Sequence, residues 1–181
     1  MNLRNQLLNQ KAFSYLKKAK KILDVGCGMG TFIKNSPKTI IGIDTNQATL
    51  KKCQKEGYQV KLGSATKIPF KASTFDGLHC AHVIEHLNPK DAYQFLKEVS
   101  RVLKPGGTFV LRTPLLWSGF YHNLTHIKPY PPQAIKRYLV ESAPDTTFPE
   151  IKPKFRKIAL HYRYNYQRLE RTGYTLVLKK I

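Results

Sequence analysis

The chain has 181 residues, of which 41% are hydrophobic and 11% aromatic, so it has enough apolar side chains for a folded core and is not disordered throughout. No apolar run approaches the roughly 20 residues of a membrane span, and residues 1–21 lack the apolar core of a signal peptide, which together indicate a soluble, cytoplasmic protein. The formal net charge of +20 favours anionic partners such as nucleic acid, an acidic membrane surface or a phosphorylated substrate.

The positive charge is concentrated at the two ends of the chain. Residues 1–21 contain six lysine and arginine residues and no acid, and residues 151–181 contain nine against one glutamate. In the first of these segments, apolar residues recur at helical spacing at Leu3, Leu7, Leu8, Ala12, Tyr15, Leu16 and Ala19. The pattern predicts a basic amphipathic helix over residues 1–20. A solubilising surface would explain the same charge without any partner.

Between residues 21 and 113, short apolar runs alternate with helical patterns. Strands are predicted over 21–25, 39–44, 58–63, 75–81 and 108–113. Helices are predicted over 46–57, which Gly57 ends, and over 89–103, where Pro89 suits the first turn. Strands that alternate with helices need crossover connections, so the pattern predicts a parallel sheet with helices on both faces.

The alternation breaks after residue 113. The remaining segments are predicted, in order, as a long loop over 114–131, a helix over 132–140 and an antiparallel strand pair over 157–166 and 173–180. The loop near 143–153 is followed by too little chain for a second domain. We therefore predict one α/β domain over residues 1–181, a Rossmann-like three-layer sandwich with a mostly parallel seven-stranded sheet and an antiparallel C-terminal strand pair.

A glycine-rich loop follows the first predicted strand. Residues 22–32, ILDVGCGMGTF, place Asp24 before Gly26, Gly28 and Gly30. This spacing matches neither the G-x-G-x-x-G of dinucleotide-binding loops nor the Walker loop. A carboxylate is unfavourable beside a pyrophosphate, but it suits a ligand with an ammonium and a sulfonium group. The glycines are still needed, because a nucleoside must pack against bare backbone.

Asp44 ends the second predicted strand, 18 residues after Gly26. A carboxylate at this position can accept hydrogen bonds from both ribose hydroxyls, which suits any adenosine cofactor. Together with Asp24, it indicates a ligand with adenosine at one end and an amino acid at the other. S-adenosylmethionine fits that description.

Five segments carry a resemblance to a known family: ILDVGCGMGTF, GIDTN (42–46), GSATKIPF (63–70), FDGLHCAHVIEHL (75–87) and LKPGGTFVLRTP (103–114). In their order and spacing, the chain resembles the class I S-adenosylmethionine-dependent methyltransferases over about residues 20–115. Its motifs are nearest to those of the ubiquinone-pathway-type and related bacterial small-molecule enzymes. The resemblance implies a cofactor site made of Asp24, Gly26, Cys27, Gly28, Gly30, Asp44, Thr45, Ser64, Ala65 and Ala81.

The resemblance also implies what these residues do. The three glycines would line the methionine and ribose, Asp44 would bind the ribose, and Thr45 would pack beside the adenine. Ser64 and Ala65 would lie at the adenine edge, and Ala81 would face the methionyl amino group. The family commonly has an aspartate where Ser64 stands, and a neutral hydroxyl contributes less to such a hydrogen bond.

The segment after the fourth predicted strand offers catalytic and metal-ligand candidates. His82, Glu85 and His86 fall at i, i+3 and i+4, on one face if the segment is helical. In ubiquinone-pathway O-methyltransferases and small-RNA 3′-end methyltransferases a similar segment reads E-x-x-E-H and binds a divalent metal, whereas His82 stands in the first position here. The sequence IEHL is also widespread among members without metal. We therefore predict no metal, with Glu85 and His86 as the candidate ligands if one binds.

The long loop adds a second group of candidates. It resembles the segment that precedes an active-site helix in the ubiquinone-type enzymes, so residues 114–140 are predicted to cover the substrate. His126 is the first candidate for a general base or substrate-orienting residue and His82 the second, with a simple hydrogen-bonded loop histidine as the alternative. Four aromatic residues either wall a substrate pocket or pack the loop itself: Trp117, Phe120, Tyr121 and Tyr130.

These observations predict transfer of a methyl group from S-adenosylmethionine to an oxygen or nitrogen of a small, anionic or lipid-like metabolite. Methylation of an exocyclic base amine is disfavoured, because residues 80–83 read CAHV in place of an N-P-P-Y-type tetrapeptide. Two alternatives remain open, an RNA methyltransferase that uses the basic ends and a cofactor-binding regulatory subunit without catalysis. The acceptor and the oligomeric state are not specified by the sequence.

Overall fold

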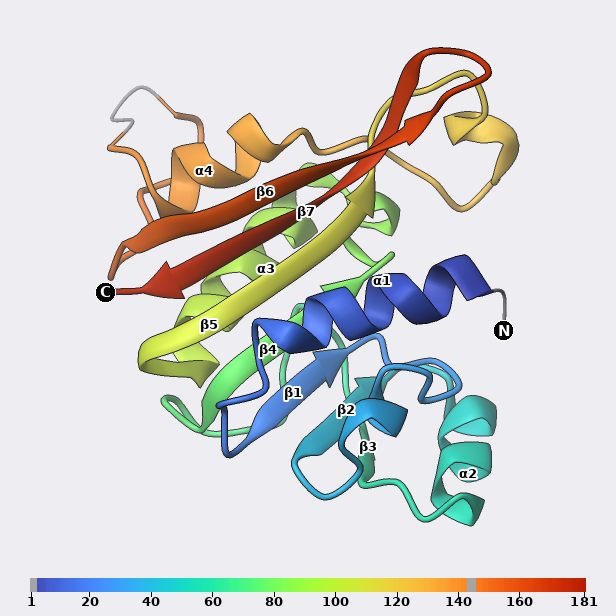
Figure 1. The fold of residues 1–181 in the computed structure, drawn as a ribbon. Helices are drawn as coiled ribbons and strands as arrows, with labels where there is room; N and C mark the ends of the chain where they lie inside the picture. Colours follow the sequence, from blue (N-terminus) through green and yellow to red (C-terminus); the bar gives the residue numbers. More distant parts are fainter. Residues whose placement is uncertain (1–2, 143–145) are drawn as a thin grey trace.

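The computed structural model describes residues 3–142 and 146–181, which form a seven-stranded sheet flanked by helices (Figure 1). The strands are β1 (Ile22–Val25), β2 (Ile40–Asp44), β3 (Val60–Leu62), β4 (Phe75–Ala81), β5 (Leu103–Pro114), β6 (Phe155–Asn165) and β7 (Glu170–Lys180). The α-helices are α1 (Leu3–Ser14), α2 (Gln47–Lys55), α3 (Pro89–Val102) and α4 (Pro132–Leu139), and the 3₁₀ turns are η1 (Ile33–Asn35), η2 (Ile84–His86) and η3 (Phe120–His122). Among the described residues, no helix is both long and apolar enough to cross a membrane.

The strand order is β3-β2-β1-β4-β5-β7-β6. The first five strands run parallel, and β7 pairs antiparallel with both β5 and β6, which confirms the predicted sheet. β5 begins earlier than predicted, because Leu103 already pairs with Phe75 of β4. Parallel strands bring their carboxyl ends to one edge, and the order reverses at β1, where β2 and β4 lie on opposite sides. Such a reversal opens a crevice at that edge.

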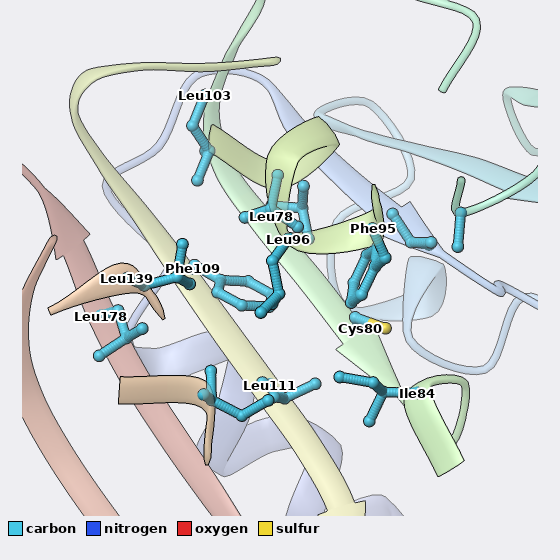
Figure 2. Packing of buried hydrophobic residues seen from close by; sticks show 14 of the residues in the cluster. Leu78, Cys80, Ile84, Phe95, Leu96, Leu103, Phe109, Leu111, Leu139 and Leu178 are labelled. Atoms are coloured by element: carbon cyan, nitrogen blue, oxygen red, sulfur yellow. The ribbon is translucent and has the colours of Figure 1, made fainter. Parts of the chain in front are cut away.

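Strand residues alternate between the two faces of the sheet, and each face packs against its own helices. On one face, Phe109 and Leu111 of β5 pack in the same cluster as Phe95 of α3 (Figure 2). On the other face, Val110 of β5 belongs to a second cluster with Leu16, just after α1. The result is the predicted three-layer arrangement, in which the sheet is buried on both sides.

Two asparagine side chains explain where α2 and α3 begin. The side-chain oxygen of Asn46 accepts hydrogen bonds from two backbone N–H groups in the first turn of α2. Asn88 accepts one from the backbone N–H of Asp91 at the start of α3, and Pro89 occupies the first turn as predicted. These caps place both helix starts beside the carboxyl edge, directly after β2 and after η2.

The first helix is shorter than its sequence pattern predicts. α1 ends at Ser14, and the chain continues in turns in which Leu16 N–H donates to Phe13 and Ala19 N–H donates to Leu16. These turns press Leu16 onto Gly77 of β4, where an added Cβ would lie 2.8 Å from Leu16 Cδ2. The helical pattern predicted for residues 1–20 was therefore wrong beyond Ser14, because packing on a strand glycine decides the path there.

Tyr174 joins β7 to the segment before α4, and it provides a test of this packing. Its buried hydroxyl donates a hydrogen bond of 2.7 Å to the carbonyl of Tyr130. The variant Tyr174→Phe should lower the free energy of unfolding by about 1–2 kcal/mol, because that carbonyl would stay buried without its partner. Urea titration followed by circular dichroism measures the change. Tyr162→Phe, at the position paired with Tyr174 in β6, is the control, and equal effects of the two variants would contradict the assignment.

Candidate active site

The glycine loop leaves β1 with three residues in the left-handed region, where φ is +71° at Gly26, +48° at Gly28 and +71° at Gly30. An added Cβ at Gly26 would overlap Val83, and one at Gly30 would lie 2.7 Å from the ring of Tyr58. Backbone conformation and available space therefore both require glycine in this loop. The loop can turn back over the end of β1 only because no side chain intervenes.

Asp44, at the end of β2, braces the glycine loop. Its Oδ2 accepts a hydrogen bond of 2.8 Å from Gly28 N–H, and its Oδ1 accepts one of 2.9 Å from Asn46 N–H. A carboxylate oxygen has a second lone pair, so the group can still accept hydrogen bonds from a ligand. Asp44 thereby couples the position of the loop to the start of α2.

These elements border a pocket of about 340 Å³ at the carboxyl edge of the sheet. Its lining consists of Val25, Gly26, Asp44, Thr45, Gly63, Ser64, Ala65, His82, Val83, His86 and Leu87. The pocket therefore unites predicted cofactor residues from the loop, from β2 and from the segment after β3 with one predicted catalytic residue, His82. Gly28 and Gly30 lie in the adjoining loop, and Ala81 precedes His82 at the end of β4.

Two of the predicted cofactor residues make contacts of their own. Cys27 is buried and packs on Gly42, where an added Cβ would lie 2.7 Å from its Sγ, and burial raises the pKa of the thiol. The Ser64 hydroxyl accepts a hydrogen bond of 3.2 Å from Thr66 N–H and lies 3.0 Å from Thr66 Oγ1. The Cys27 side chain thus belongs to the core, and Ser64 closes a local turn at the rim of the pocket.

Asp24, which the sequence placed near the ammonium group of a ligand, is buried in β1 opposite His79 of β4. The His79 Nδ1 lies 2.7 Å from Asp24 Oδ1, and the ring of Phe32 stacks on the imidazole at a centroid distance of 3.6 Å. Burial lowers the pKa of His79, although Asp24 opposes the shift, so the imidazole is neutral and donates its Nδ1–H. Sequence reasoning missed this pair, because only the sheet register brings the two residues together.

A layer of buried polar groups lies between α1 and the sheet. Arg112 follows Val110 by two positions in β5 and so points to the same, α1-facing side. Among the described residues, the buried side-chain atoms without a hydrogen-bond partner are Asn9 Oδ1, His79 Nε2, Arg112 Nε and Nη1, and Arg163 Nε. Burial lowers the pKa of Arg112, and burial with the nearby charge of Arg112 lowers the pKa of Arg163 to about 10. Two guanidinium groups therefore hold buried N–H donors without a hydrogen-bond partner, and the charges of Asp24 and Glu85 partly oppose the lowering of the Arg112 pKa.

Glu85 is a buried carboxylate that connects three segments. It accepts a hydrogen bond of 3.0 Å from Thr113 Oγ1 in β5 and lies 3.1 Å from Nδ1 of His82. Burial raises its pKa, but the hydrogen bonds from His82 and Thr113 outweigh burial, and the net pKa is lowered. Its backbone carbonyl accepts the N–H groups of Ile127 and Lys128 at 2.8 and 3.3 Å. Glu85 therefore fixes the long loop over η2.

His86 and His126 face each other beside this carboxylate, with ring centroids 5.0 Å apart. The Nδ1 of His86 lies 2.9 Å from the carbonyl of Thr125, and the Nδ1 of His126 lies 2.7 Å from that of Phe120. A carbonyl only accepts, so each Nδ1 carries the proton and each Nε2 keeps a lone pair. One ligand atom each from Glu85, His86 and His126 lie within 4.8 Å of one another. Sequence reasoning named all three residues but did not combine them into one group.

The aromatic residues of the long loop divide into two groups. Phe120 and Tyr130 are buried, and the Tyr130 hydroxyl donates a hydrogen bond of 2.9 Å to the carbonyl of Leu87. Trp117 is half-buried and Tyr121 is exposed. Of the two roles that the sequence left open, Phe120 therefore packs the loop, whereas Tyr130 packs it and also lines a separate pocket of about 170 Å³.

Comparison with known proteins places this geometry in context. The family described as "Methyltransferase domain" matches residues 23–111. An uncharacterized methyltransferase of Schizosaccharomyces pombe is 38% identical over 111 residues, covering 51% of this chain and 39% of the relative. A phthiotriol/phenolphthiotriol dimycocerosates methyltransferase of Mycobacterium tuberculosis is 34% identical over 102 residues, covering 50% of this chain and 36% of the relative.

Other similarities extend to an RNA-modifying enzyme and to a solved fold. A tRNA (carboxymethyluridine(34)-5-O)-methyltransferase of Arabidopsis thaliana is 30% identical over 117 residues, covering 64% of this chain and 28% of the relative. The chain spans less than half the length of these curated relatives. A crystal structure of a SAM-dependent methyltransferase from Archaeoglobus fulgidus superposes with a TM-score of 0.75 at 21% identity, covering 97% of this chain and 94% of that one.

The two unpartnered donors of Arg112, Nε and Nη1, lead to a prediction about stability. The variant Arg112→Met should lower the free energy of unfolding by less than Arg101→Met does, because the Nε and Nη1 donors of Arg112 have no hydrogen-bond partner to lose, although its attraction to Asp24 and Glu85 is lost. Urea unfolding measures the change. Arg101→Met is the matched control and should be destabilising, since Arg101 donates to the Glu98 carboxylate and to the carbonyls of Ile68 and Phe70. A loss of stability in Arg112→Met as large as that in Arg101→Met would contradict this expectation.

Proposed function

We propose that this chain transfers a methyl group to an oxygen or nitrogen of a small, anionic or lipid-like acceptor. It belongs to the class I S-adenosylmethionine-dependent methyltransferases, which supports methyl transfer as its reaction. The observation that carries the proposal is the meeting, at one edge of the sheet, of the glycine loop, Asp44 and the group formed by Glu85, His86 and His126. The first two suit an adenosine cofactor, and the third can take a proton or hold a cation beside it.

The residues present fit S-adenosylmethionine, which supplies an electrophilic methyl group when bound. Nothing lies within 4 Å of the place where a Cβ of Gly28 would stand, so the backbone there is bare and open to a nucleoside, whereas Val83 and Tyr58 already fill the corresponding space at Gly26 and Gly30. The free lone pairs of Asp44 suit ribose hydroxyls, and Thr45, Ser64 and Ala65 line the same pocket for the adenine. The glycine loop and the backbone at Ala81 would receive the methionine part.

His126 is the proposed general base. Its Nδ1–H is held by the Phe120 carbonyl, so the Nε2 lone pair is the atom that can accept the proton of the acceptor. S-adenosylmethionine would supply the methyl group and leave as S-adenosylhomocysteine, and His126 Nε2 would take up the proton that the acceptor loses. The nearby ionised carboxylate of Glu85 stabilises the resulting imidazolium. His82, on the pocket wall, is the second candidate for this role.

The same three residues support a second proposal, that Glu85, His86 and His126 hold a divalent cation. Histidine ligands of metals usually donate their other ring N–H to a carbonyl or carboxylate, as His86 and His126 do. A cation there would take the place of a general base by lowering the pKa of a bound acceptor hydroxyl. Two nitrogen ligands and one carboxylate suit zinc or a similar transition metal.

Two features support an anionic or lipid-like acceptor. The donors of Arg112 and Arg163 face a buried layer near the site and suit a carboxylate or phosphate. The mycobacterial relative is named for phthiotriol compounds, and the tRNA-modifying relative keeps an RNA acceptor as the alternative. A regulatory subunit without catalysis would bind the cofactor and transfer nothing.

The role of Asp44 can be tested by calorimetry with S-adenosylhomocysteine. Asp44→Ala should weaken binding about 10- to 100-fold, because it removes the ribose acceptor and releases Gly28 from its brace. Asp44→Asn, which keeps one acceptor oxygen, should fall between this variant and the wild type. Asp76→Ala is the control, since that carboxylate binds Lys104 at the start of β5. Normal binding by Asp44→Ala would refute the cofactor placement.

The role of His126 can be tested with S-adenosylmethionine labelled in its methyl group and an extract of metabolites and lipids. His126→Ala should lower incorporation of label at least about 100-fold with little change in S-adenosylhomocysteine affinity. His122→Ala, an exposed histidine of the same loop, is the control.

A chelator separates the two proposals for this group. If a cation operates, the chelator abolishes transfer, zinc restores it, and His86→Ala loses zinc affinity in calorimetry. If His126 is a base, the chelator has no effect. Unchanged incorporation in His126→Ala would exclude both.

A further inference from the structure

Large apolar side chains are exposed in two loops beside the candidate active site. In the loop after β5 these are Leu116, Tyr121, Leu124 and Ile127, and in the turn between β6 and β7 they are Tyr166 and Leu169. Leu124 is 99% exposed and Leu169 is 87% exposed, so neither contributes to the core. We call these six residues the apolar rim. Exposed apolar groups that gather in one region mark a surface for binding.

The two loops form one surface. Arg168 Nη1 lies 2.6 Å from Ser118 Oγ, and that hydroxyl donates a hydrogen bond of 3.3 Å to Glu170. Figure 1 shows the β6–β7 turn and the loop after β5 at the same end of the molecule, on the side where the N-terminal turn of α1 also lies. That turn adds two exposed leucines, Leu3 and Leu7. The rim therefore lies at the carboxyl edge of the sheet, the same edge at which the cofactor pocket opens.

Basic side chains lie among the apolar ones. Arg4, Lys128, Arg168 and Arg171 are exposed in the same segments. Residues 114–131 contain no acid, and Glu170, which follows the β6–β7 turn at the start of β7, accepts a hydrogen bond from the Ser118 hydroxyl that Arg168 also contacts. Aliphatic tips with cations around them suit an anionic lipid surface, where the tips enter the acyl boundary and the cations meet phosphates.

Other occupants fit this surface less well. Single-stranded RNA binds through aromatic platforms, and the rim offers two exposed rings, Tyr121 and Tyr166, but its other four members are aliphatic, among them the most exposed, Leu124 and Leu169. A second copy of the chain would bring two strongly basic surfaces together, because the net charge is +20.

We propose that the apolar rim docks this protein on anionic lipid bilayers, so that the cofactor pocket faces an acceptor held at the membrane surface. The proposed membrane binding depends only on the apolar rim. The conclusion that the acceptor is held at the membrane rests in addition on the proposed methyl transfer. Docking at this end would bring His126 close to a lipid-like acceptor while the acceptor stays in the bilayer.

The test is co-sedimentation of the whole chain with vesicles of phosphatidylcholine alone or mixed with phosphatidylglycerol. The wild type should bind the mixed vesicles and bind pure phosphatidylcholine at least about tenfold more weakly. The double variant Leu124→Glu with Leu169→Glu should lose at least about tenfold in binding to mixed vesicles. Ile158→Glu is the matched control, since Ile158 is 44% exposed in β6 outside the rim, and it should bind as the wild type does.

S-adenosylhomocysteine calorimetry on the same proteins separates docking from catalysis. Unchanged cofactor binding with lost vesicle binding in the double variant supports docking through the rim. A wild type that binds S-adenosylhomocysteine but no vesicles overturns docking and leaves the proposed methyl transfer in place. Vesicle binding without cofactor binding supports docking and refutes the proposed function. Equal loss in Ile158→Glu, or salt-sensitive binding of mixed RNA in place of vesicles, would also overturn the proposal.

Discussion

The candidate active site depends on one buried charge, the carboxylate of Glu85. A buried carboxylate is costly unless donors surround it, and here Thr113 of β5 and His82 provide them. The backbone carbonyl of the same residue holds the long loop through the N–H groups of Ile127 and Lys128. The end of β5, the η2 turn and the loop are thus held together at one residue. His126 lies against His86 because Glu85 anchors the loop that carries His126.

The distribution of charge within the molecule follows from two opposite requirements. A cationic cofactor needs nearby carboxylates, and Asp44 and Glu85 stand at the pocket or next to it. The chain as a whole is strongly basic, and around the pocket its exposed cations lie beside apolar tips such as Leu124 and Leu169. Acidic groups therefore lie where the cofactor would bind. Basic groups and exposed apolar side chains lie where we propose that an anionic lipid surface would bind.

Sequence patterns predicted the sheet well, because strand and helix periodicity are local and the βα alternation permits few topologies. The glycine loop after the first strand and the place of Asp44 at the end of the second were also predicted, since each follows directly from a strand end, and the structure adds that the glycines are left-handed. The end of α1 was not, because the contact between Leu16 and Gly77 joins distant parts of the chain. The partner of Asp24 was missed for the same reason, since sheet register alone puts His79 opposite it.

The sequence by itself therefore determined the class of sheet and the glycine loop and indicated the kind of cofactor, because the patterns that carry them are formed by residues close together in the chain. Only the tertiary structure decided that His126 joins Glu85 and His86, and that Arg112 lies in a buried layer with its Nε and Nη1 donors unpaired. These relations depend on how separate strands and loops pack. Spacing along the chain does not encode distances between segments that meet only at the edge of a sheet.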